Sequence, residues 1–127
     1  DAMRLNQVTV PLIDYEASKA FYLRLGLKLI VDSPPHYARF EMPEGGSTFS
    51  IETVDGWPGG DWPEVWFESD RLDELVLELK EKGVIFEREP ETMSYLWRVA
   101  QLRDPAGTRI ALYHAGENRL NPPWRVK

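Results

Sequence analysis

The chain carries one residue pattern twice, and this duplication limits what it can fold into. Gln7 and Glu64 each open a strand-like run, which leads into an amphipathic helical stretch that ends at Gly26 or Gly83. Both pairs of positions are 57 residues apart (64 − 7 and 83 − 26). Two similar units in one short chain predict two structural modules packed as a pair. Such a pair creates a cleft, and clefts are where small molecules usually bind.

Each repeat is predicted to contain a strand, a helix and three further strands. In the first repeat Asp14 is expected to cap the helix, because its carboxylate can accept from free amides of the first turn. Strands are expected there at 5–12, 27–31, 36–42 and 47–54. In the second repeat an apolar stripe at Leu72, Leu75, Val76 and Leu79 indicates the helix. Its strands are expected at 64–67, 84–87, 94–103 and 109–114, the last two joined by the tight turn 104–107.

Both helices are amphipathic, so each needs a sheet face to cover. We therefore predict an α+β fold in which paired βαβββ modules form a cupped mixed β-sheet with the helices on the outer face. The 127 residues are expected to form a single domain. Module 1 covers about 4–54, a linker rich in glycine and proline covers 55–63, module 2 covers about 64–115, and a C-terminal arm covers 116–127.

Composition argues against several classes of function. The chain has no cysteine, which removes disulfides and thiolate nucleophiles and fits a cytoplasmic protein. A net charge of −6 without a cluster of Lys or Arg argues against nucleic acid and anionic membrane surfaces as partners. No run approaches the roughly 18 apolar residues of a membrane span. We expect a homodimer, because Trp57, Trp62 and Trp124 would otherwise expose large apolar surface.

This arrangement resembles the vicinal oxygen chelate superfamily, which includes glyoxalase I, extradiol dioxygenases and bleomycin and fosfomycin resistance proteins. Three stretches carry the resemblance, which extends from about residue 5 to residue 113: the strand and helix of 7–22, the second repeat of 64–83, and the Asp-Pro-x-Gly hairpin of 104–112. In the first stretch the helix pattern is Asp14, Ser18, Phe21 and Tyr22. The resemblance points to a fold and not to one activity, because one fold hosts many chemistries.

The resemblance implies a divalent metal held by His, Glu or Gln side chains on the first and last strands of the two modules. These positions fall on Gln7, Glu64, Ala111 and, in the first module, near Ser50 or Glu52, of which Glu52 is preferred. Ala111 cannot coordinate a metal, and both histidine positions are lost. Gln7, Glu52 and Glu64 would offer only oxygen donors, which suit hard cations. We therefore expect a degenerate metal site and no cofactor, with a divalent metal on these three residues as the alternative. For Glu52 the role of a solvated strand carboxylate is favoured over that of a ligand.

Gln7 and Glu64 are the candidate catalytic residues. Gln7 would bind a substrate oxygen, or it is a polar residue whose hydrogen bonds are satisfied in a wet cavity. Glu64 would act as a general base with a raised pKa in an aromatic pocket. The alternative for Glu64 is a structural ion pair with Arg39, Arg98 or Arg109.

Aromatic side chains are predicted on the sheet face opposite the helices, with Arg98 and Arg109 nearby. The candidate substrate-binding residues are Tyr37, Arg39, Trp66, Tyr95, Trp97 and Tyr113. Core filling is the alternative for the aromatic ones, and the two histidines, His36 and His114, are expected to be structural. We predict that the chain binds a small aromatic or unsaturated organic molecule in the cupped sheet. The alternatives are a metal-dependent lyase, isomerase or dioxygenase, and a non-catalytic accessory module.

Overall fold

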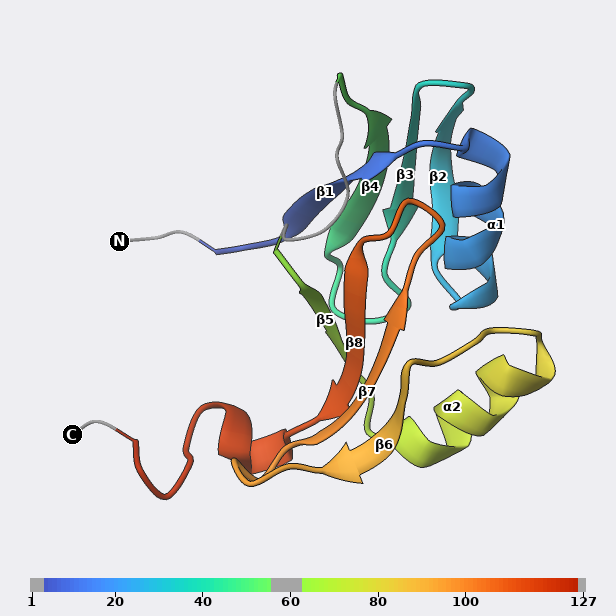
Figure 1. Cartoon of the computed structure of the whole chain (residues 1–127). Helices are drawn as coiled ribbons and strands as arrows, with labels where there is room; N and C mark the ends of the chain where they lie inside the picture. Colours follow the sequence, from blue (N-terminus) through green and yellow to red (C-terminus); the bar gives the residue numbers. More distant parts are fainter. Residues whose placement is uncertain (1–3, 56–62, 126–127) are drawn as a thin grey trace. The chain divides into compact units, whose positions relative to one another are not determined.

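The computed structural model describes residues 4–55 and 63–125 (Figure 1). The chain divides into two compact units. The first unit holds the first 61 residues together with the short segment Asp104–Thr108, and the second unit holds the rest. Each unit contains one helix and one four-stranded sheet, in the element order strand, helix, strand, strand, strand. The predicted α+β fold of two βαβββ modules is confirmed.

The first unit is a mixed sheet with one helix, α1 (Tyr15–Arg24), packed on it. Its strands are β1 (Gln7–Leu12), β2 (Lys28–Ser33), β3 (Tyr37–Glu41) and β4 (Thr48–Thr53), in the order β1-β4-β3-β2. β1 runs parallel to β4, whereas the other two pairings are antiparallel. The fully buried Tyr22 of α1 packs its ring against Phe49 and Phe40, with centroids 4.6 and 5.9 Å away. The core of this unit therefore lies between α1 and one face of the sheet.

Local sequence sets both ends of α1. Asp14 lies just before the helix with extended backbone, and its carboxylate accepts a hydrogen bond from the Ala17 amide at 3.0 Å. This confirms the predicted N-cap, which satisfies one of the amides that have no partner within the helix. Gly26 follows the helix with a φ of +100°, a conformation that residues with a side chain rarely adopt.

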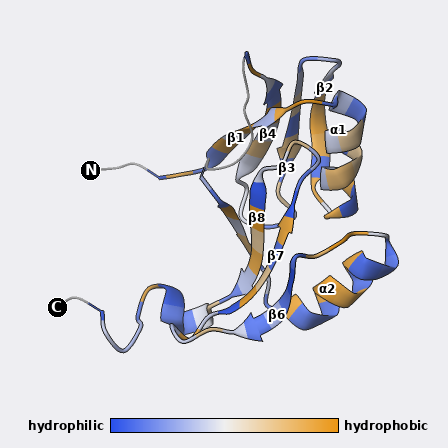
Figure 2. Cartoon of the chain, viewed as in Figure 1, coloured by the Kyte–Doolittle hydropathy of each residue, from blue (hydrophilic) through white to orange (hydrophobic). Residues whose placement is uncertain are grey.

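The second unit repeats this arrangement with helix α2 (Leu72–Glu81). Its strands are β5 (Val65–Glu68), β6 (Arg88–Thr92), β7 (Arg98–Arg103) and β8 (Arg109–His114), in the order β5-β8-β7-β6 with β5 parallel to β8. The short 3₁₀ helix η1 (Gly116–Arg119) follows β8. Of the predicted apolar stripe, Leu72, Val76 and Leu79 are buried, and Figure 2 shows hydrophobic and hydrophilic residues on different sides of α2. In the described part of the chain no helix is long and apolar enough to cross a membrane.

The predicted positions of the two strands around residue 90 are wrong. Residues 84–87 are not a strand, and the strand lies at β6 instead, with Pro90 in its middle. Val84 is buried, but Ile85 is 85% exposed, so this apolar run does not build a sheet face. Residues 94–96 form a turn, with Leu96 at a φ of 72°, so that β7 begins at Arg98 and not at residue 94. Pairing with β7, and not local hydrophobicity, sets the position of this edge strand.

The predicted tight turn after β7 is confirmed. The Gly107 amide donates to the Asp104 carbonyl at 2.9 Å, and Gly107 has a φ of +90°. The buried Asp104 carboxylate accepts from the Tyr22 hydroxyl at 2.6 Å and from the amides of Ala106 and Thr108, each at 2.9 Å. Burial raises the pKa of Asp104 above its usual value, although these hydrogen bonds act in the opposite direction. One carboxylate thus joins α1 to the turn that groups with the first unit.

Candidate functional site

The sheet face of the first unit that points away from α1 is polar. Along β3 and β4 the side chains alternate, so that Phe40, Phe49 and Ile51 enter the core while Tyr37 and Arg39 occupy the opposite face. An open groove of about 670 Å³ lies over this polar face. It is lined by Gln7, Thr9, Ile30, Tyr37, Arg39, Thr48 and Glu52. These residues form the candidate site, which we call the β1–β4 groove.

Gln7 is held at both ends of its amide group. Its nitrogen Nε2 lies 3.1 Å from both Ser50 Oγ and Thr9 Oγ1, to which it donates, and its oxygen Oε1 accepts from the Thr48 hydroxyl. These contacts follow from the parallel register of β1 and β4, which places Gln7 beside Thr48. Gln7 is therefore a polar residue whose hydrogen bonds are satisfied, as expected under the alternative to a catalytic role. The catalytic role of Gln7 stays a prediction.

Arg39 is anchored on Tyr37. Its Nε donates to the Tyr37 hydroxyl at 2.8 Å, and its guanidinium carbon lies 5.5 Å from the centre of the Tyr37 ring. The Tyr37 hydroxyl is in turn hydrogen-bonded to Ser50 Oγ at 2.8 Å, and Ser50 is fully buried. Among residues 4–55 and 63–125, nothing bonds to the two terminal nitrogens of Arg39. The guanidinium is thus fixed at one nitrogen and free to bind at the other two.

Glu52 contributes a carboxylate to the same groove. It lies directly across from Tyr37 in the pairing of β3 with β4. Its side chain is exposed and forms no hydrogen bond or ion pair with any residue that the structure describes. Among the described residues that line it, the groove therefore contains one cation, Arg39, and one carboxylate that does not neutralise it.

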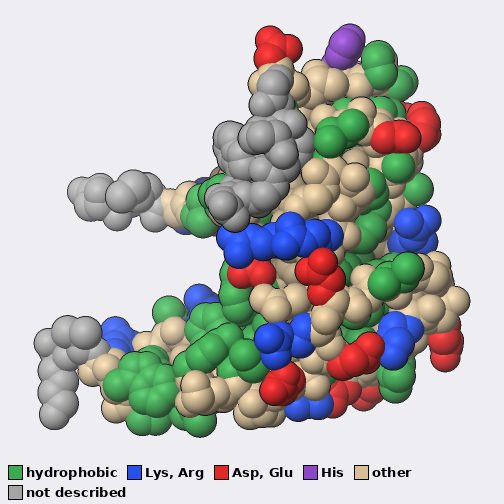
Figure 3. Space-filling model, in the orientation of Figure 1, with side chains coloured by type: hydrophobic (Ala, Val, Ile, Leu, Met, Phe, Trp, Pro, Cys, Tyr) green, Lys and Arg blue, Asp and Glu red, His purple; other side chains and the backbone are tan. Residues whose placement is uncertain are grey.

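Four of the five predicted aromatic residues gather in the second unit. The rings of Trp97 and Tyr113 are stacked, with centroids 5.0 Å apart, and Trp66 meets both edge-on at 5.7 and 5.3 Å. Tyr95 meets Trp97 edge-on at 5.9 Å. Tyr37, in contrast, belongs to the groove of the first unit. The cluster also packs on Val99, Ala111, Ala115 and Met93. Figure 3 shows hydrophobic side chains gathered in the lower left part of this face of the molecule.

The C-terminal segment borders this aromatic cluster. The indole nitrogen of Trp97 donates to the Asn118 carbonyl at 3.2 Å. Trp124, one of the three tryptophans predicted at a dimer interface, is 58% exposed. Trp57 and Trp62 lie outside the described residues. The homodimer therefore stays a prediction.

Glu64 has a partner, Gln101, that its sequence position does not predict. The side-chain nitrogen of Gln101 on β7 donates to Glu64 Oε2 at 3.2 Å. The side-chain oxygen of the same Gln101 accepts from Arg88 Nε at 3.0 Å. Arg98, which was expected beside the aromatic pocket, instead pairs with Asp73 of α2 at 2.8 Å. That expectation is wrong, because side chains alternate along β7 and Arg98 points to the helix-covered face. The role of Glu64 as a base stays a prediction.

The residues at the metal positions implied by the resemblance do not fit a metal ion. Ala111 is fully buried in the apolar cluster, and both ends of the Gln7 amide already form hydrogen bonds. Glu64 accepts from an amide. Within the described residues no three His, Asp or Glu side chains are grouped so that they would hold a metal. Hard cations need several oxygen donors, whereas Ala111 offers none and the Gln7 and Glu64 side chains are already engaged in hydrogen bonds.

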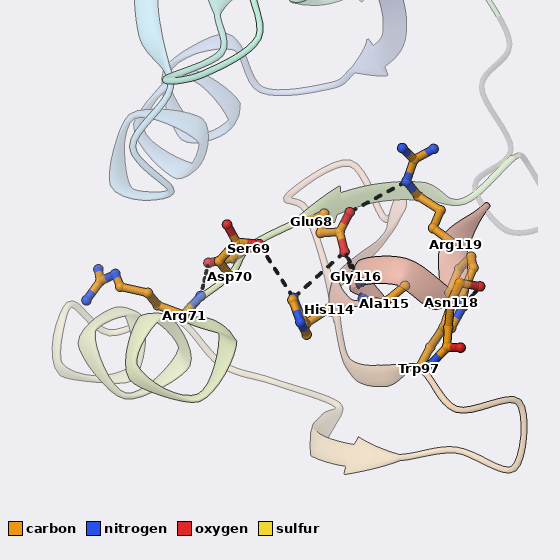
Figure 4. A network of polar contacts seen from close by, with 10 residues as sticks. All are labelled: Glu68, Ser69, Asp70, Arg71, Trp97, His114, Ala115, Gly116, Asn118 and Arg119. Carbon is orange, nitrogen blue, oxygen red and sulfur yellow. Dashed lines mark hydrogen bonds and ion pairs between the residues drawn. The ribbon is translucent and has the colours of Figure 1, made fainter. Parts of the chain in front are cut away.

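A second polar network, centred on Glu68, was not predicted as a unit (Figure 4). Glu68 Oε2 accepts from the amides of Ala115 and Gly116 at 2.8 and 2.9 Å. Arg119 Nε lies 3.7 Å from Oε1, and His114 Nδ1 lies 3.8 Å from Oε2. Glu68 therefore connects β5 to the start of η1. The sequence gives one indication of this network. Glu64, Trp66 and Glu68 alternate along the strand, so their side chains are expected on the same face of the sheet.

This network predicts an acid-sensitive contribution to stability. Burial by itself raises the pKa of Glu68, but the amides of Ala115 and Gly116 and the nearby His114 and Arg119 lower it more, so the net pKa lies below the usual 4.5. A carboxyl group with a lowered pKa in the folded state stabilises that state above its unfolded pKa, and this contribution is lost as the pH falls through the folded pKa. We expect the melting temperature of the wild type to fall more steeply below pH 4.5 than that of Glu68→Gln. Thermal melts across this range measure the difference.

The control is Glu89→Gln, which removes an exposed carboxylate paired with Lys80 at 3.0 Å. This variant should keep the acid sensitivity of the wild type, because exposed ion pairs contribute little. Equal slopes for the wild type and Glu68→Gln would contradict the assignment.

Several solved structures have the same fold as this chain. A glyoxalase/bleomycin resistance protein/dioxygenase from Nocardioides has a TM-score of 0.79 at 19% sequence identity, covering 100% of this chain and 91% of its own. A bleomycin-binding protein in complex with bleomycin has a TM-score of 0.71 at 20% identity, covering 89% and 98%. The lactoylglutathione lyase of Agrobacterium tumefaciens has a TM-score of 0.72 at 16% identity, covering 87% and 92%. At these identities the similarity concerns the fold alone.

Sequence comparison identifies the family. No curated protein matches the chain. The family model of the Glyoxalase/Bleomycin resistance protein/Dioxygenase superfamily matches residues 4–112. That match spans both βαβββ modules and agrees with the resemblance inferred from the duplicated pattern. The chain therefore belongs to the glyoxalase/bleomycin resistance protein/dioxygenase superfamily.

Proposed function

We propose that this protein binds a small organic molecule, with a carboxylate and an aromatic or unsaturated body, in the β1–β4 groove. The observation that carries the proposal is the state of Arg39, whose Nε is fixed on Tyr37 at 2.8 Å while its terminal nitrogens lack a described partner. A guanidinium presents its remaining donors as a planar fork that matches a carboxylate. Fixing one nitrogen in advance reduces the entropy that binding would otherwise lose.

The rest of the groove suits such a ligand. Its volume of about 670 Å³ is typical of small-molecule sites, which span roughly 300 to 1,000 Å³. Ile30 on β2 is 46% exposed and lines the groove, so it offers apolar contact to the body of the ligand. The Tyr37 hydroxyl supplies a further donor when Ser50 Oγ donates to it, because its own hydrogen then points elsewhere.

The aromatic cluster of the second unit is a separate apolar surface that can contact a planar ligand. Trp66 and Trp97 are half-buried, and Tyr95 is 38% exposed. Rings of this kind bind planar groups by stacking. Trp66, Tyr95, Trp97 and Tyr113 are therefore proposed as ligand-binding residues of the second unit, where Tyr113 contributes mainly by supporting Trp97 at 5.0 Å.

Binding is favoured over the chemistry of a metal-dependent lyase, isomerase or dioxygenase. Three of the four residues at the implied metal positions are an alanine in an apolar cluster and two side chains already engaged in hydrogen bonds. Among fold neighbours, the bleomycin-binding protein was solved with bleomycin bound. Bleomycin is therefore a reasonable probe to include with the planar carboxylates.

The test is binding of cinnamate, compared with the uncharged cinnamamide, by calorimetry or by chemical-shift titration. We expect the wild type to prefer cinnamate, and Arg39→Met to weaken cinnamate binding by about 10- to 100-fold. That range follows from roughly 1.5–3 kcal/mol for a hydrogen bond to a charged group. Arg39→Lys should recover only part of the loss, because lysine keeps the charge but not the fork.

The control is Arg103→Met, which removes an exposed arginine paired with Glu87 at 3.2 Å in the second unit. It should leave cinnamate binding unchanged. Equal affinity of Arg39→Met and the wild type would contradict the proposal, and so would a failure of every carboxylate probe to bind.

A further inference from the structure

We propose that the β1–β4 groove selects ligands that carry an ammonium group as well as a carboxylate, of which aromatic amino acids are the simplest. The inference rests on the binding function proposed above and narrows its ligand class. It assigns Glu52 as the specificity-determining residue, opposite in charge to Arg39.

The backbone places these two charges close together. Tyr37 pairs with Glu52 and Arg39 pairs with Ser50, so Arg39 and Glu52 occupy diagonal positions on the neighbouring strands β3 and β4. Such diagonal neighbours lie about 7–8 Å apart, within reach of long side chains. Both residues line the same groove.

The two charges nevertheless do not pair. Within residues 4–55 and 63–125, neither Arg39 nor Glu52 forms an ion pair. Among the described residues, several other long basic side chains do so: Lys19, Arg71, Lys80, Arg88, Arg98, Arg103 and Arg119. The cause is the hydrogen bond from Arg39 Nε to the Tyr37 hydroxyl, which holds the guanidinium near the Tyr37 ring. A cation and a carboxylate are thus kept apart in one groove.

This arrangement is complementary to a zwitterion. The fork of Arg39 would take the carboxylate of the ligand, and Glu52 would take its ammonium group. A ligand with a carboxylate alone would leave Glu52 facing its negative charge, which weakens binding. The neighbouring polar residues Gln7 and Thr48 are hydrogen-bonded to each other, so they do not compete for the carboxylate or the ammonium group of the ligand.

The test compares phenylalanine with 3-phenylpropanoate, which has the same carboxylate and ring but no ammonium group. Both are titrated into the full chain by calorimetry. We expect the wild type to bind phenylalanine about fivefold more tightly, as one partly solvated ion pair would provide. Glu52→Gln should remove this preference and bind 3-phenylpropanoate more tightly than the wild type does.

The matched control is Glu41→Gln on β3, which changes the net charge of the protein by the same amount as Glu52→Gln does. Glu41 is not among the residues that line the groove. This variant should keep the preference of the wild type. The inference would be overturned if Glu52→Gln kept the wild-type preference for phenylalanine over 3-phenylpropanoate, or if Glu41→Gln lost this preference to the same extent. The binding function would still stand in either case, because both ligands still bind. If neither ligand binds the folded wild type, both the proposed function and the inference are overturned.

Discussion

Replacing Asp104 by alanine is expected to lower the free energy of unfolding by about 3–5 kcal/mol. Asp104 is 4% exposed and accepts from the Tyr22 hydroxyl and from the amides of Ala106 and Thr108. Its removal deletes the acceptor of three hydrogen bonds in a buried place, and each buried polar group that loses its partner is unfavourable by roughly 1–3 kcal/mol. Urea denaturation of the wild type and of Asp104→Ala measures the loss directly.

Tyr22→Phe is the matched control. It removes one of the three hydrogen bonds but keeps the ring that packs on Phe49 at 4.6 Å, so we expect a smaller loss of about 1–2 kcal/mol. The double variant should lose less than the two single losses added together, because both substitutions act on one network. A loss in Asp104→Ala no greater than that in Tyr22→Phe would show that the turn amides do not depend on the carboxylate.

Placing glutamate at position 111, where the resemblance implies a metal ligand, is also expected to destabilise this chain, by about 3–5 kcal/mol at neutral pH. Ala111 is fully buried, packs with Val99 and Tyr113, and pairs across the sheet with Trp66. A glutamate there would crowd these side chains and bury a carboxylate without a partner. The measurement is again the free energy of unfolding of Ala111→Glu.

Ala111→Gln separates the effect of size from that of charge. The two variants have side chains of similar volume, so the difference between them reports the buried charge. That difference should shrink as the pH falls, because a buried carboxylate takes up a proton at a raised pKa. If Mn²⁺ raised the melting temperature of Ala111→Glu but not of Ala111→Gln, the conclusion that these residues do not fit a metal ion would be wrong.

Features encoded by neighbouring residues could be predicted from the sequence. The Asp14 cap and the turn from Asp104 to Gly107 depend on contacts within four positions. The duplicated pattern predicted two modules, because each repeat has the same order of elements. Strand alternation also placed Tyr37 and Arg39 together on the face away from α1.

Features that depend on distant pairing could not be predicted in this way. The hydrogen bond from Tyr22 to Asp104 joins residues 82 positions apart. The contacts of Gln7 with Thr48 and Ser50 require the parallel register of β1 and β4, which no local pattern gives. The apolar run at residues 84–86 predicted a strand, whereas the ladder with β7 fixes the strand further along, at Arg88–Thr92.

The position of Pro90 has a consequence for how this protein behaves at high concentration. β6 is the outermost strand of its sheet, and Pro90 lies in its middle between two glutamates, Glu89 and Glu91. An incoming strand from another molecule would find one amide hydrogen missing from this edge, together with charged side chains. The same residues that obscured the strand in the sequence thus protect the sheet from edge-to-edge aggregation along β6.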